Sequence, residues 1–257
     1  MNDNLETLNI RLQGEVCIVE MDRPEALNAF NGQLMDDLCD AFLAATADVA
    51  VKVLVLTGAG RAFTAGADLK EMGQGSHKPK HGFGPLVEAI IDFPKPFICA
   101  VNGVGAGIGA TICGLADLVY MAENARLRCP FSALGLTAEA ASTVTLPRLM
   151  GHQRASWFLL SSEWMSAAEC LDAGLALEVL PLAELLPRVM DRAQTLAALP
   201  MASLKKTKAL MLDPIRQQLK DSARFENQGL AELSGGPANR EALAAFKEKR
   251  APDFTGL

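Results

Sequence analysis

One stretch of this sequence restricts the possible folds more than any other, residues 51–72, VKVLVLTGAGRAFTAGADLKEM. Its first part, Lys52–Thr57, consists mainly of β-branched residues and leucine, which predicts a buried strand that ends in the following glycine turn. Gly66 and Asp68 then predict a tight bend and the start of a helix, because glycine permits the bend and aspartate can cap the first turn. A strand followed by a helix in this way is typical of a layered α/β fold.

The bend at Ala65–Asp68 also has a chemical consequence. Backbone N–H groups at the start of a helix have no partner within the helix and lie at the positive end of its dipole. They can therefore hold an anion or an oxygen that becomes negatively charged during a reaction. An ordinary strand-to-helix connection has the same sequence pattern, so this stretch alone leaves both interpretations open.

Charge and cysteine content exclude several classes of function. The 257 residues carry a net charge of −6 and no extended basic cluster, which argues against nucleic acid as a partner. The six cysteines are scattered without a CxxC pair and lie mostly among apolar residues. We therefore expect reduced, buried thiols and no metal site. The polar N-terminal segment carries no secretory signal, and we expect a cytoplasmic protein.

Residues 97–116 contain no charged side chain over a length that could span a bilayer. Polar and glycine residues interrupt the stretch: Asn102, Gly103, Gly105, Gly107, Gly109 and Gly114. No basic cluster flanks it, as one would flank a membrane span. We therefore expect a strand over 97–101 and a helix over 105–115 in a protein core, and no contact with a membrane.

Strands and helices alternate up to about residue 150, and helices dominate after it. Further strands are expected at 16–20, 118–121 and 177–180. Helices are expected from Asn31 onward, at 86–91, 153–160, 166–173, 182–198, 202–211, 215–233 and 239–249. This distribution predicts an α/β core in residues 1–200 and a helical element in residues 201–257.

A second glycine-rich turn, in residues 100–110 (AVNGVGAGIGA), again follows a strand and opens a helix. Its Gly105-x-Gly107-x-x-Ala110 spacing matches the dinucleotide-binding fingerprint loosely. The fingerprint does not explain why a similar bend exists at Gly66. Two such bends belong together if each supplies one N–H to the same oxygen, as a thioester carbonyl that becomes an enolate requires.

Several motifs taken together resemble those of the crotonase superfamily, the enoyl-CoA hydratase/isomerase group, over essentially the whole chain. They are MDRPEALNAF, GRAFTAGADLKEM, AVNGVGAGIG, PRLMG and FKEKRAPDFTG. The resemblance implies an α/β fold built as a spiral of repeated ββα units, with a C-terminal helical region that forms trimers. It implies an acyl-CoA thioester as substrate, with coenzyme A as part of that substrate and no separate cofactor. The expected assembly is a homotrimer or a hexamer built as a dimer of trimers.

The resemblance also implies site residues. By position in the motifs, the amides of Ala67 and Ile108 hold the thioester oxygen. Substrate contacts are expected around the first bend and from one residue of an earlier loop: Ala65, Gly66, Asp68, Leu69, Lys70 and Leu27. Lys70 is equally well explained as a solvated helix charge, and Leu27 as a buried loop anchor.

At the positions of both catalytic glutamates of the enoyl-CoA hydratases, this sequence has Thr111 and Phe131, neither of which can move a proton in that role. Glu139, by contrast, stands alone among small and apolar residues, so desolvation is expected to raise its pKa toward the range of a general base. Its placement is similar to that of the single acid in the peroxisomal-type Δ3,Δ2-enoyl-CoA isomerases. A solvent-exposed acid at a helix start would fit the same local sequence.

The leading hypothesis is therefore an isomerase that moves the double bond of a 3-enoyl-CoA to the 2-position, with Glu139 as general acid/base. One alternative is another reaction of the superfamily, namely hydration, thioester hydrolysis or dehalogenation. A catalytically silent acyl-CoA-binding protein and a nucleotide-cofactor enzyme built on the Gly105 turn are further alternatives. The acyl chain and the pathway do not follow from the sequence.

Overall fold

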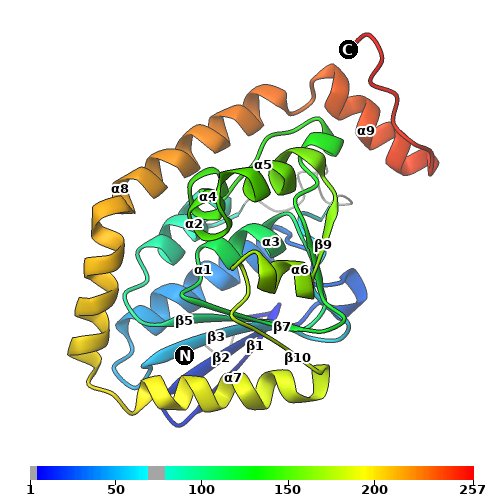
Figure 1. Ribbon diagram of the computed structural model, residues 1–257. Coiled ribbons are helices and arrows are strands. Elements are labelled where there is room, and N and C mark those ends of the chain that lie inside the picture. Colours follow the sequence, from blue (N-terminus) through cyan, green and yellow to red (C-terminus); the bar gives the residue numbers. More distant parts are fainter. Residues whose placement is uncertain (1–4, 69–78) are drawn as a thin grey trace.

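The computed structural model describes residues 5–68 and 79–257 (Figure 1). Its larger sheet has six strands in the order β1-β2-β3-β5-β7-β10, in which only β1 and β2 pair antiparallel. The bounds of these strands are Leu8–Gln13 (β1), Val16–Met21 (β2), Val53–Gly58 (β3), Phe97–Val101 (β5), Leu118–Ala122 (β7) and Glu178–Leu180 (β10). Strands β3 and β5 are buried along their whole length, as expected for parallel strands covered on both faces.

A second, smaller sheet has four strands in the order β4-β6-β8-β9. Their bounds are Ala62–Thr64 (β4), Val104–Ala106 (β6), Arg126–Arg128 (β8) and Trp164–Ser166 (β9). Strands β4, β6 and β8 each follow directly on a strand of the larger sheet, namely β3, β5 and β7. The chain therefore repeats a unit of two strands followed by a helix, which confirms the expected α/β spiral of ββα units.

Helices cover both faces of the larger sheet. Figure 1 shows α7 on one side of this sheet and α1 to α4 on the other. The helices are Gly32–Ala47 (α1), Phe83–Ile91 (α2), Ile108–Thr111 (α3), Ser142–Met150 (α4), His152–Ser161 (α5), Ala167–Asp172 (α6), Leu182–Ala197 (α7), Met201–Leu233 (α8) and Pro237–Glu248 (α9). The short 3₁₀ helices are Pro24–Ala26 (η1), Ile112–Gly114 (η2) and Ser132–Leu134 (η3).

Helix α1 begins where the sequence predicts it. The side chain of Asn31 accepts a hydrogen bond from the Leu34 amide at 2.9 Å, which satisfies one of the free donors at the helix start. Its buried residues include Leu34, Leu38 and Phe42, and this apolar side faces the core. The ring of Phe42 packs edge-on against Phe97 of β5, with ring centroids 5.1 Å apart.

Three of the expected helices are wrong in their bounds. Gly105 lies in β6 and pairs with Leu127, so the helix expected over 105–115 begins only at Ile108. A side chain at Gly105 would meet Leu127 Cδ2 at 2.6 Å, which explains the glycine at this close approach of two strands. The helices expected over 202–211 and 215–233 form one helix, α8, with Pro214 inside it. Contacts on both sides of the proline hold this helix: Lys208 binds Asp117 at 2.6 Å before it, and Lys220 binds Asp92 at the end of α2 at 2.6 Å after it.

The C-terminal helices surround the core of their own chain. Helix α8 begins at Met201, contacts α2 and α4, and curves around the outside of the molecule (Figure 1). Helix α9 contacts η3. A division of the chain at residue 200 and a role of residues 201–257 in oligomerisation stay predictions.

All six cysteines are buried and none forms a disulfide, as expected from the sequence: Cys17, Cys39, Cys99, Cys113, Cys129 and Cys170. Burial raises the pKa of Cys17 to about 11, which keeps this thiol protonated and unreactive at neutral pH. None of the helices in the described part of the chain combines the length and apolarity that a bilayer crossing requires.

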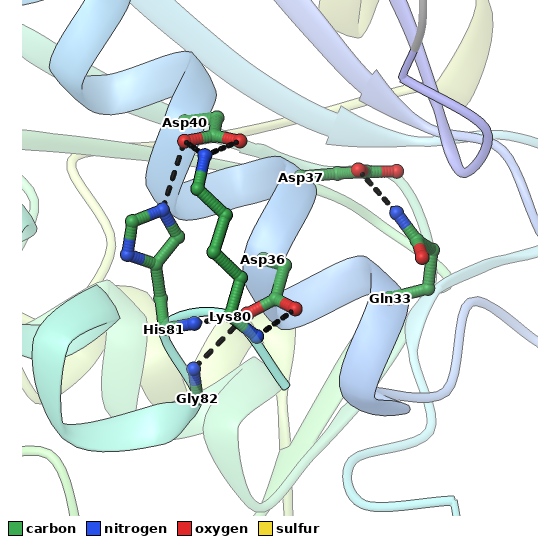
Figure 2. Close-up of polar contacts among 7 residues, drawn as sticks. All are labelled: Gln33, Asp36, Asp37, Asp40, Lys80, His81 and Gly82. Atoms are coloured by element: carbon green, nitrogen blue, oxygen red, sulfur yellow. Dashed lines mark hydrogen bonds and ion pairs between the residues drawn. The ribbon is translucent and has the colours of Figure 1, made fainter. Parts of the chain in front are cut away.

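Acidic side chains of α1 hold the segment that leads into α2 (Figure 2). The Asp36 carboxylate accepts hydrogen bonds from the amides of Lys80 at 2.6 Å, His81 at 2.7 Å and Gly82 at 3.1 Å. Asp40 binds the Lys80 ammonium at 2.9 Å and His81 Nε2 at 2.8 Å. The start of α2 is therefore fixed on α1 through charge-assisted hydrogen bonds.

Candidate active site

The two glycine bends that the sequence singles out touch each other. Gly66 has φ +86°, and a side-chain carbon added there would lie 2.7 Å from the Ala106 carbonyl oxygen and 3.6 Å from Gly107 N. A carbon added at Gly107, which has φ +55°, would lie 3.8 Å from Gly66 Cα. The pairing of β4 with β6 brings the bends together, because each bend follows directly on one of these strands.

The N–H group of Ala67 points away from the neighbouring segment at Phe30. The Phe30 amide donates to the Gly66 carbonyl at 2.7 Å, and the Asp68 amide donates to the Phe30 carbonyl at 3.0 Å. In such a parallel bridge, the N–H of the residue between the two bonds faces the opposite side. Within residues 5–68 and 79–257, the Ala67 amide donates no hydrogen bond.

The amide of Ile108 is also a free donor. Ile108 is the first residue of α3, so its N–H has no partner within the helix. Among the residues that the structure describes, none accepts a hydrogen bond from it. Two unused donors therefore follow directly on two glycines that are in contact. Their role toward an oxyanion stays a prediction.

The carboxyl group of Glu139 lies at the same place. A carbon added at Gly107 would lie 3.8 Å from Glu139 Oε1, and the Thr111 hydroxyl donates to the same oxygen at 3.4 Å. Glu139 is partly buried, and its neighbour Ala140 is buried. The side chain is thus turned toward the second bend. The alternative interpretation, a solvent-exposed acid at a helix start, does not account for this orientation.

The surroundings of Glu139 suit a general base. Burial, and to a smaller extent the negative charge of Glu226, raise the pKa of Glu139 to about 8, against the opposing effect of the hydrogen bond from Thr111. A carboxyl group with a pKa near neutral pH can both take and return a proton during one turnover. Perturbed carboxyl groups of this kind are concentrated at functional sites.

The two positions that hold glutamates in the hydratases lie in the core here. Thr111 is fully buried in α3, where its hydroxyl contacts Glu139. Phe131 is buried and packs in the hydrophobic core. Neither side chain can transfer a proton. Glu139 is the acid that lies against Gly107, whereas Asp68 of the first bend is paired with Arg23.

The predicted substrate residues around the first bend also lie together. The Ala65 amide donates to the Leu27 carbonyl at 2.9 Å, which joins the earlier loop to the bend at Gly66. Asp68 pairs with Arg23 at 3.1 Å in a largely buried ion pair. Their contacts with a substrate stay predictions. The other two predicted substrate residues, Leu69 and Lys70, lie outside the described residues.

Asn28 is a supporting residue that the sequence analysis did not single out. It is fully buried with φ +54°, a backbone region in which asparagine is one of the more common residues. Its amide nitrogen donates to the carbonyls of Ala59 and Ala62 at 2.9 Å and of Phe63 at 3.2 Å. One side chain therefore holds the turn between β3 and β4. The sequence signal that could have identified Asn28 is its place directly after Leu27 in the motif MDRPEALNAF.

Replacement of Asn28 by alanine is expected to lower the free energy of unfolding by about 2–3 kcal/mol, because several buried carbonyls lose their donor. Chemical denaturation followed by circular dichroism measures this loss. Asn9, which is exposed on the edge strand β1, provides the control, and Asn9→Ala is expected to change stability by less than about 0.5 kcal/mol. Equal stability of the two variants would contradict this role of Asn28.

No group of three His, Cys, Asp or Glu side chains in residues 5–68 and 79–257 is arranged to hold a metal ion. At the two bends, the described structure places two backbone donors, Ala67 and Ile108, and the Glu139 carboxyl group. Such a set can stabilise an enolate and move a proton next to it.

Comparison with known proteins places these features in a family. Residues 11–257 match the family model described as enoyl-CoA hydratase/isomerase. The chain is 33% identical to the 1,2-epoxyphenylacetyl-CoA isomerase of Escherichia coli K12, over 98% of this chain and 99% of that protein. It is 34% identical to the enoyl-CoA delta isomerase 2 of Rattus norvegicus, over 80% of this chain and 54% of that protein. Other relatives of similar identity are named as probable enoyl-CoA hydratases.

A solved structure agrees over nearly the whole length. The enoyl-CoA hydratase/isomerase from Pseudoalteromonas atlantica T6c superimposes with a TM-score of 0.93 at 33% identity, covering 97% of this chain and all of that one. The repeated ββα units, the two touching glycine bends and the match along the chain lead to one conclusion. The chain belongs to the enoyl-CoA hydratase/isomerase family of the crotonase superfamily.

Proposed function

We propose that this protein is an acyl-CoA double-bond isomerase that converts a 3-enoyl-CoA into the 2-enoyl-CoA. The observation that carries the proposal is the position of Glu139, whose carboxyl oxygen faces Gly107 while Thr111 and Phe131 occupy the positions of the hydratase acids. One acid that takes and returns a proton is sufficient for isomerisation. Hydration requires in addition that a water molecule be activated, which two carboxylates do well.

The proposed reaction uses three groups of the chain. The Glu139 carboxylate takes a proton from C2 of the 3-enoyl thioester, and the electron pair moves onto the thioester oxygen. The amides of Ala67 and Ile108 stabilise the resulting dienolate by donating hydrogen bonds to that oxygen. Glu139 then returns the proton at C4, which leaves the double bond between C2 and C3 and restores the carboxylate.

A substrate comparison tests this proposal. The purified protein is incubated separately with a 3-enoyl-CoA and with a 2-enoyl-CoA, and the products are separated chromatographically. We expect the absorbance of the conjugated thioester to rise with the first substrate and no 3-hydroxyacyl-CoA to form from the second. Formation of 3-hydroxyacyl-CoA without isomerisation would identify a hydratase, and binding without turnover of either substrate would identify a silent acyl-CoA-binding protein.

The raised pKa of Glu139 predicts the pH dependence. The reactive form is the carboxylate, and a pKa of about 8 means that this form is scarce below that pH and dominant above it. We therefore expect kcat/KM to rise with pH and to reach half of its plateau near pH 8. Initial rates across this range measure the midpoint. A midpoint close to the ordinary glutamate value of 4.5 would contradict this environment for the base.

The same proposal includes the assembly and location of the enzyme. We propose a homotrimer, or a hexamer built as a dimer of trimers, that works in the cytoplasm without a separate cofactor. Large apolar side chains on α8 support an oligomer, since Leu210 is 65% exposed, Met211 69% and Phe225 59% in the single chain. Burial of such residues against a second subunit is energetically favourable.

A further inference from the structure

Glu226 is a buried acid of α8 that the proposed reaction does not use. It is 6% exposed, and its carboxylate accepts hydrogen bonds from the amides of Ala141 at 2.6 Å and Thr143 at 2.9 Å. The hydroxyls of Thr143 and Ser222 donate to it at 2.6 and 3.2 Å. An ionised carboxylate is only an acceptor, so four donors satisfy it.

These hydrogen bonds hold an unusual piece of backbone next to Glu139. Ala140 and Ala141 both have φ +57°, in the left-handed region that alanine rarely adopts. The turn runs from Glu139 into α4, and the Ser142 amide closes it by donating to the Glu139 carbonyl at 3.1 Å. Such a conformation persists only when the surrounding structure holds it in place. Glu226 binds the amide of the second left-handed residue and the first turn of α4.

We propose that Glu226 is a positioning residue for the catalytic base: it holds the left-handed turn at Ala140–Ala141 and thereby directs Glu139 toward Gly107. This inference rests on the proposed function of Glu139. It assigns to α8, a helix outside the repeated ββα units, a direct effect on the site.

Glu226 also acts on Glu139 through its charge. The Thr111 hydroxyl from α3 donates to the Glu139 carboxyl, the charge of Glu226 from α8 acts on it, and the Cys129 thiol, which follows β8, is near enough to be affected by the charge of Glu139. The thiol is uncharged, because burial and the nearby Glu139 raise its pKa well above the usual value. Glu226 is thus the negative charge that opposes ionisation of the base. Its removal lowers the pKa of Glu139.

The experiment compares Glu226→Gln with Glu232→Gln. Glutamine keeps the size and one acceptor oxygen of Glu226 but removes its charge, and Glu232 is an exposed acid on the same helix. For Glu226→Gln we expect the midpoint of the kcat/KM profile to move to lower pH by on the order of one unit. We also expect its plateau kcat to fall about tenfold with little change in KM. The control is expected to match the wild type in all three quantities.

A Glu226→Gln enzyme with the wild-type midpoint and plateau kcat would overturn the inference. Should this variant not fold, Thr143→Val removes one donor to Glu226 and leaves the charge. That variant is then expected to lower kcat about threefold to tenfold at an unchanged midpoint, and an unchanged kcat would overturn the inference in the same way. The Glu139→Gln variant separates the two proposals, because retained turnover there contradicts the role of Glu139 itself.

Discussion

The Glu139→Gln variant is expected to lose about 1,000-fold in kcat on a 3-enoyl-CoA while it binds acyl-CoA nearly as well as the wild type. Glutamine has the size of glutamate but cannot take a proton from C2. The carboxyl group is partly buried and faces Gly107 and Thr111, so an amide of the same shape can occupy the position without repacking of its neighbours. The loss therefore reports the proton transfer and not the shape of the site.

Steady-state rates and the dissociation constant of a saturated acyl-CoA measure the two effects separately. Glu123→Gln is the matched control. Glu123 is an exposed acid directly after β7, and its replacement is expected to leave kcat unchanged. Retention of more than about a tenth of the wild-type kcat by Glu139→Gln would show that another group is the base.

The Gly66→Ala variant is expected to lose about 100-fold or more in kcat/KM, the usual cost of losing one oxyanion donor. Gly66 has φ +86°, and the added methyl group would lie 2.7 Å from the Ala106 carbonyl oxygen, closer than two such atoms can approach. The first bend must therefore move away from the second. The Ala67 amide, which follows Gly66, moves with it.

The Gly14→Ala variant distinguishes the effect of this clash on kcat/KM from the effect of strained backbone alone. Gly14 has φ +61°, in the same left-handed region, but nothing lies within 4 Å of an added side-chain carbon there. This control is expected to lose some stability and to keep the wild-type kcat/KM. Circular dichroism tests whether both variants are folded under the assay conditions. Wild-type kcat/KM in folded Gly66→Ala would contradict the role of the two bends.

Local sequence was sufficient for several of the longer elements, although the six-residue edge strand β1 was not predicted. The apolar runs of β3 and β5 and the asparagine cap of α1 are signals contained within a few residues. The strands of the second sheet, β4, β6, β8 and β9, were not predicted individually. Each has three residues, which is too short for an alternating pattern, and none forms a longer apolar run of the kind that predicted the other strands. Pro214 lies between the two helices that the sequence predicted, but packing of α8 on the core outweighs the one hydrogen bond that proline removes.

By itself, the sequence determined the family, the two glycine bends and the acid at position 139, because motif residues and glycine positions are local properties of the chain. Only the tertiary structure decided that the bends touch and that the Glu139 carboxyl faces Gly107. It also brought Glu226 onto the Ala141 amide, across 85 residues of sequence. Contacts at such separations depend on how sheets and helices pack, and no local pattern encodes which distant side chain fills a given space.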